Sequence, residues 1–139
     1  MAVVLDAVVP IGVAVSDPGC SRAFEDILTR GRCYMTIASV EEFACAVREY
    51  CGEQLAEKWI AWLLSVDGIE IVESRYRQYM SEHFVTFVAE AYAGTRITVP
   101  AASAAALASH LKVPLATNRP SFADLERDGF CEILWVRGS

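Results

Sequence analysis

The sequence predicts an α/β fold in three layers, α/β/α, with a central, mainly parallel sheet of about five strands. Short apolar runs that favour strands alternate along the chain with amphipathic or alanine-rich stretches that favour helices. This order is typical of a parallel sheet with helices on both faces. Hydrophobic residues make up 54% of the 139 residues, and this length suits one core, so we expect a single domain over residues 1–139.

The first predicted strand is Ala2–Leu5, a continuous apolar run that is typical of a strand buried on both faces. It ends at the polar residue Asp6. A turn is expected over residues 16–19, because Ser, Asp, Pro and Gly follow one another there. Ser21 is the expected cap of a helix that stops at Gly31.

The middle of the chain predicts two more strands and three helices. Residues 34–37 favour a strand, and Ser39 is the expected cap of the helix that follows. A helix is expected over 54–65, where apolar residues recur at three- and four-residue intervals. Ile69–Val72 favours a strand, and residues 75–92 have the pattern of a long amphipathic helix.

The last third contains the most regular helix signal. Pro100 opens an alanine-rich helix that ends at Leu111, and its small side chains suit close packing on a sheet. Residues 113–117 predict a strand, residues 121–127 a short helix, and residues 131–136 the last strand.

Charge and hydropathy exclude several classes of protein. The net charge of −6 disfavours the broad basic surface of a nonspecific nucleic-acid binder. The longest apolar runs fall far short of the roughly 20 residues that span a bilayer. No basic segment precedes the first apolar run, so we expect no signal peptide and a cytoplasmic protein.

The cysteines predict reduced thiols. An odd number at irregular spacing, with no CxxC pair, indicates free thiols in a reducing compartment and disfavours a zinc site. The five are Cys20, Cys33, Cys45, Cys51 and Cys131.

Polar residues gather where the predicted strands end, which is where parallel sheets carry their functional groups. Asp6 follows the first strand, and Glu42 lies early in a helix. The helix that Pro100 opens begins at the same edge. Asn118 and Arg119 follow the strand that ends at Thr117.

Three segments carry a family resemblance: VVLDAVVPIGVAV at the start, TIASVEEFACAVRE in the middle and VPAASAAALASHLKVPLATNRPSFADL near the end. In order and spacing they resemble the PIN domain family, in particular the small VapC-type toxins, and the resemblance spans essentially the whole chain. It implies the three-layer fold above and a cluster of three or four acidic residues. In the family, these residues hold Mg²⁺ or Mn²⁺ and cleave RNA, and carboxylates suit such hard cations.

The resemblance carries over only in part to this chain. Asp6 falls on the first family aspartate and Glu42 on the family glutamate. The helix-start aspartate falls on Ala101, and the aspartate after the last site strand falls on Arg119. The small hydroxyl residue that often follows the first aspartate is Val8 here. The pattern therefore implies a remnant acidic site of Asp6 and Glu42, which would be the only metal ligands if any metal binds.

The charges predict poor metal binding. Four carboxylates would carry −4, whereas Asp6, Glu42 and Arg119 together carry −1. A guanidinium beside two carboxylates can replace a cation through charge-assisted hydrogen bonds. Our hypothesis is that Arg119 takes the electrostatic role of the metal, so no cofactor is expected, and Mg²⁺ or Mn²⁺ only if the protein is active.

Each site residue also has a plainer interpretation. Asp6 could cap a nearby amide, and Glu42 could be an exposed helix carboxylate. Arg119 could be a solvated loop residue or reach an RNA phosphate. Asn118 and Thr117 could supply weak oxygen ligands, although an amide is a poor substitute for a carboxylate.

The remaining polar and aromatic residues are expected to be structural. Ser103, Trp59 and Trp62 are interpreted as packing residues, and His83 and His110 as surface or core-edge histidines. An aromatic stripe is expected in the core, with part of it available as a dimer surface, and three acidic residues are expected on the surface. The stripe is Tyr76, Tyr79, Phe84 and Phe87, and the acidic residues are Asp124, Glu126 and Asp128.

Three functions remain open on the sequence. The favoured one is a VapC-type PIN-like domain of a toxin–antitoxin or RNA-processing system whose nuclease activity is impaired or lost. The second is an active Mg²⁺- or Mn²⁺-dependent endoribonuclease toxin. The third, an unrelated domain that binds a small ligand, is disfavoured because no GxGxxG or GxxxxGK[ST] motif occurs. The resemblance implies an antitoxin partner, RNA and a homodimer, and we expect neither membrane nor DNA as a partner.

Overall fold

The computed structural model describes residues 2–72 and 97–137, whose strands form one five-stranded sheet in the order β3-β2-β1-β4-β5. β1 (Ala2–Leu5) is central, between β2 (Arg32–Thr36) and β4 (Leu115–Thr117). β3 (Ile69–Val72) and β5 (Ile133–Trp135) are the edge strands. Every neighbouring pair is parallel, which confirms the predicted sheet.

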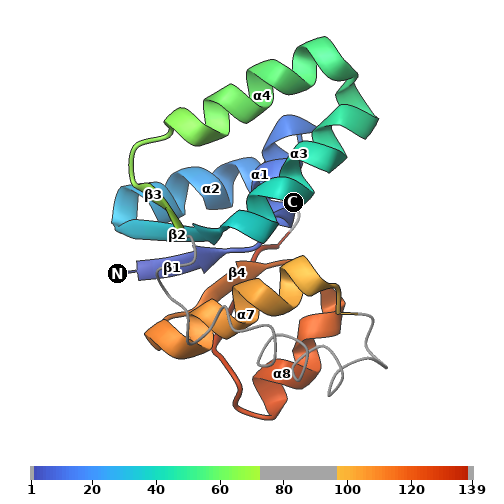
Figure 1. Ribbon diagram of the computed structural model, residues 1–139. Coiled ribbons are helices and arrows are strands. Elements are labelled where there is room, and N and C mark those ends of the chain that lie inside the picture. The colour runs from blue at the N-terminus through green and yellow to red at the C-terminus, as the bar shows by residue number, and fades with distance from the viewer. Residues whose placement is uncertain (1, 73–96, 138–139) are drawn as a thin grey trace.

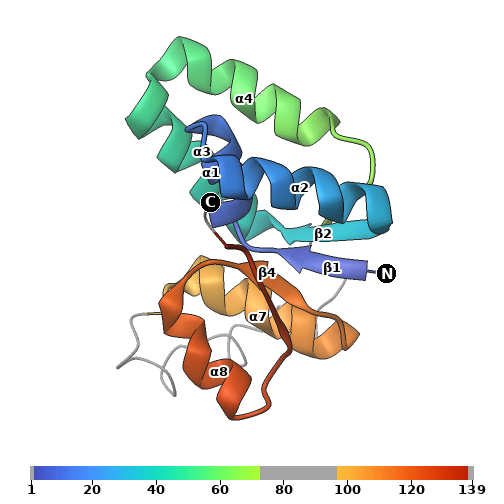
Figure 2. The same cartoon turned by 180° about the vertical axis from the view of Figure 1, so that it is seen from behind.

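Helices cover both faces of the sheet, and the two opposite views in Figures 1 and 2 show the three layers. One face carries the first four helices and the other carries α7 and α8, with a short 3-10 turn, η2, before α8. This confirms the predicted α/β/α arrangement. The bounds are α1 Val8–Ala14, α2 Pro18–Arg30, α3 Ile37–Cys51, α4 Glu53–Ser65, α7 Val99–Leu111, η2 Pro120–Phe122 and α8 Ala123–Arg127.

The strands divide their side chains between two cores, because successive residues of a strand point to opposite faces. Val3 and Leu5 of β1 pack with α1 to α4, while Val4 between them packs with α7 and α8. The alanine-rich helix α7 is buried along residues 101–108, so its small side chains let it lie close against the sheet.

The helix α1 was not predicted. Its sequence, VVPIGVA, combines β-branched residues with Pro10 and Gly12, which are poor helix formers. Pro10 and Gly12 are both buried, and α1 packs on α2 and α3. Tertiary packing therefore decides a helix that local propensity disfavours.

Two predicted helix caps were wrong, and the caps lie earlier in the chain. Asp17, not Ser21, caps α2 and accepts the amide of Gly19 at 2.9 Å. Thr36, not Ser39, caps α3, and its hydroxyl accepts the amide of Ser39 at 3.0 Å. The strand predicted over 34–37 therefore ends at Thr36, because that side chain already starts the helix.

The two tryptophans of α4 are packing residues, as predicted. Trp59 and Trp62 pack edge to face with ring centroids 5.2 Å apart, and Trp62 lies 5.3 Å from Phe24, as expected for packing residues. The long helix predicted over 75–92, its aromatic stripe and His83 lie outside the described residues. None of the helices in residues 2–72 and 97–137 combines the length and apolarity needed to cross a bilayer.

Candidate functional site

The candidate site lies where β1 and β4 end at the carboxyl edge of the sheet. Asp6 directly follows β1, and its amide donates to the carbonyl of Ala116 at 3.0 Å, which extends the pairing of the two strands by one residue. Thr117 ends β4 beside it. Asp6 and Thr117 are both fully buried, so a carboxylate stands inside the protein at the centre of this edge.

Arg119 neutralises that carboxylate. Its Nε donates to Oδ2 of Asp6 at 2.7 Å, and its Nη2 donates to Oδ1 at 3.1 Å. The same Nη2 donates to Oε1 of Glu42 at 2.6 Å. One guanidinium therefore bridges both carboxylates, and its two-pronged contact with Asp6 is the strong, charge-assisted form of this pair.

Thr117 holds the aspartate and the arginine together. Its hydroxyl donates to Oδ2 of Asp6 at 2.7 Å and accepts the backbone amide of Arg119 at 3.1 Å. These two hydrogen bonds fix the position of the loop after β4 relative to the end of β1. The sequence indicated Thr117 only as a weak oxygen ligand, whereas its hydroxyl links Asp6 to the backbone of Arg119.

Glu42 reaches the site from α3, and its side chain is 23% exposed, against 19% for Arg119 and 0% for Asp6. The three charges therefore run from the interior to the surface. Burial by itself lowers the pKa of the Arg119 guanidinium, but the hydrogen bonds and charges of Asp6 and Glu42 outweigh burial and raise that pKa. Arg119 therefore stays positively charged between the two carboxylates.

As arranged, these residues do not fit a divalent cation. Both oxygens of Asp6 and Oε1 of Glu42 already accept hydrogen bonds from Arg119 or Thr117. Ala101, the residue that the resemblance places where an aspartate would be expected, offers only a methyl group and is fully buried. Within residues 2–72 and 97–137, no three His, Cys, Asp or Glu side chains gather closely enough to hold a metal ion.

A buried hydroxyl cluster lies one strand away, at the end of β2. The hydroxyl of Thr36 contacts Oγ of Ser39 at 3.1 Å and Oγ of Ser103 at 2.9 Å, and Ser103 donates to the carbonyl of Pro100 at 2.7 Å. The cluster joins the starts of α3 and α7. Ser103, which the sequence suggested as a packing residue, is buried and makes hydrogen bonds that link the starts of these two helices.

Asn118 turns away from the carboxylates and approaches Sγ of Cys20 with Nδ2 at 3.9 Å. Val8 begins α1 and packs at the edge of the core. Burial and the neighbouring carboxylate of Asp17 raise the pKa of the Cys20 thiol to about 11, so the thiol is protonated at neutral pH.

The other polar residues singled out from the sequence lie elsewhere. His110 is exposed in the last turn of α7. Asp124 pairs with Arg127 on α8, and Glu126 accepts the indole N–H of Trp135 at 3.2 Å. Asp124 and Glu126 therefore make contacts within α8 and between α8 and β5.

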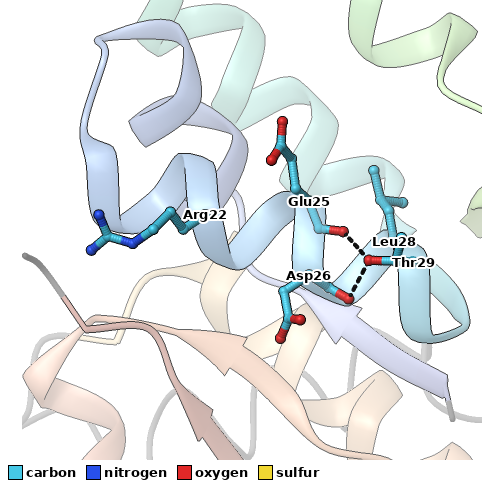
Figure 3. A pocket seen from close by; sticks show the side chains of 5 residues that line it. All are labelled: Arg22, Glu25, Asp26, Leu28 and Thr29. Carbon is cyan, nitrogen blue, oxygen red and sulfur yellow. Dashed lines mark hydrogen bonds between the residues drawn. The ribbon is translucent and has the colours of Figure 1, made fainter.

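A separate hollow along α2 brings no reactive groups together. Figure 3 shows the carboxylates of Glu25 and Asp26 pointing in opposite directions and Arg22 extending away from both. The hydroxyl of Thr29 donates to the backbone carbonyls of Glu25 and Asp26, and Asp26 pairs with Arg30 at 3.2 Å. These side chains stabilise the helix rather than converge on a ligand.

Comparison with known proteins identifies the fold. No family model matches the chain, and no curated protein matches it either. A crystal structure of VapBC2 from Rickettsia felis, described as bound to a DNA fragment from the promoter, matches with a TM-score of 0.70 and 13% identity. The match covers 99% of this chain and 100% of that one. At that identity the likeness establishes the fold alone, and the fold is PIN-like, of the VapC type.

Proposed function

We propose that this protein is a VapC-type PIN-like domain of a toxin–antitoxin or RNA-processing system, with its nuclease activity impaired or lost, that acts by binding protein or RNA. The observation that carries the proposal is the bridge from Arg119 to Asp6 and Glu42. Metal-dependent phosphodiester cleavage needs a cation that activates water and neutralises charge on the phosphate. Arg119 cannot activate water, because a guanidinium has no open coordination position.

The proposed partners follow from the fold and the closed site. The R. felis structure is described as VapBC2, which suggests an antitoxin-like protein as the partner of this chain. A partner that inserts a basic side chain between Asp6 and Glu42 would have to displace Arg119, so we expect a different mode of contact. A homodimer and a cytoplasmic location remain predictions. With a net charge of −6 we expect no direct contact of this chain with DNA.

The alternative function is an active endoribonuclease that uses Mg²⁺ or Mn²⁺. A single nitrogen, Nη2 of Arg119, contacts both carboxylates, so Asp6 and Glu42 converge closely enough to share one ion if Arg119 leaves. Magnesium usually keeps several waters, and two carboxylates can suffice in such a site. The two functions therefore differ in whether a metal can displace Arg119.

Calorimetric titration with Mn²⁺ and Mg²⁺, paired with an RNA cleavage assay, separates the two. We expect no binding at micromolar metal concentrations and no cleavage by the wild-type protein or by Asp6→Asn. Micromolar Mn²⁺ binding together with cleavage that Asp6→Asn abolishes would establish the nuclease instead.

A variant with two added carboxylates tests whether Arg119 and Ala101 are the reason for the proposed weak metal binding. Arg119→Asp combined with Ala101→Asp removes the bridging cation and adds two carboxylates, so Mn²⁺ affinity should rise at least about tenfold, which corresponds to about 1.4 kcal/mol. Arg32→Asp makes the same arginine-to-aspartate charge change on an exposed residue at the start of β2, the end of the strand away from the site, and should leave affinity unchanged. Because Ala101 is buried, Arg119→Ala alone serves as a second variant and should bind Mn²⁺ more weakly than the double variant. Equal, unchanged affinity in all of them would show that these positions do not form a site.

A further inference from the structure

We draw no further inference here: the strongest candidate, the exposed apolar surface of α4 at Leu55 and Leu64, carries nothing because no contact among residues 2–72 and 97–137 shows what covers it.

Discussion

At the scale of the residue, Arg119 explains how Asp6 can be fully buried. A carboxylate inside a protein is costly unless it is paired and hydrogen-bonded. Asp6 receives two hydrogen bonds from Arg119 and one from Thr117, so its charge is compensated and both oxygens are occupied. The same contacts that permit burial also take the oxygens that a metal would need.

Removing this guanidinium should therefore cost stability. Arg119→Met keeps much of the side-chain volume but leaves Asp6 buried without a counter-charge, and we expect a loss of about 3–5 kcal/mol in the free energy of unfolding. Urea denaturation measures it. Arg127→Met, which removes an arginine from an exposed pair on α8, should change stability by no more than about 0.5 kcal/mol. Similar small losses in both variants would mean that Arg119 is dispensable to the fold.

At the scale of the element, the contact between α1 and α2 depends on the absence of a side chain at Gly12. A Cβ placed there would lie 2.3 Å from Sγ of Cys20 and 2.4 Å from its Cβ. Cys20 is buried, and its Cβ is bonded directly to the backbone of α2, so it can move away only if the helix itself shifts. The two helices can approach this closely only with glycine at position 12.

The change in the free energy of unfolding caused by Gly12→Ala distinguishes the effect of packing from that of helix propensity, because the two have opposite signs. Propensity alone would stabilise an interior helix position by roughly 1 kcal/mol, whereas the clash with Cys20 should destabilise by about 1–3 kcal/mol. Thermal unfolding measures the difference. Adding Cys20→Gly to Gly12→Ala should recover part of the loss by removing the opposing atoms. A stabilised Gly12→Ala variant would contradict the close packing of α1 on α2.

At the scale of the whole molecule, buried thiols lie in both cores. Cys33 packs between the sheet and α1 to α4, and Cys131 packs against α7 and α8. Burial raises the pKa of the Cys33 thiol to about 11, and burial together with the charge of Glu126 raises that of Cys131 to about 11. Both thiols are therefore held protonated well above neutral pH.

The fold should lose stability at alkaline pH for this reason. The unfolded thiol releases its proton near its ordinary pKa of 9.0 and the folded Cys33 only near 11. Its contribution is therefore complete below pH 9 and lost as the pH rises toward 11. The free energy of unfolding should fall by up to about 1.4 kcal/mol per pH unit for each such thiol.

Denaturation at several pH values between 8 and 11 measures the slope. Cys33→Ala should make it shallower, and Cys45→Ala, which changes an exposed cysteine, should leave it as in the wild type. An identical slope in all three proteins would show that ionisation of the Cys33 thiol does not contribute.

The sequence by itself determined the three-layer fold and the order of most of its elements. Alternating apolar runs and helical stretches specify which side chains must be buried, and burial against a sheet leaves few arrangements for so short a chain. The strand Ala2–Leu5 and the alanine-rich helix were both predictable from their own residues. The helix α1 was not, because its propensity is poor and its packing on α2 and α3 comes from distant parts of the chain.

For the candidate site, too, the sequence predicts which residues take part, and the tertiary structure decides their contacts. Asp6, Glu42 and Arg119 could be named as residues of one sheet edge, because the ends of parallel strands meet there. Only the tertiary structure decided that Arg119 bridges both carboxylates, that Thr117 positions them and that Asn118 turns toward Cys20 instead. Asp6 and Arg119 are 113 positions apart, and the direction of a charged side chain depends on atoms from several elements at once, which no local pattern records.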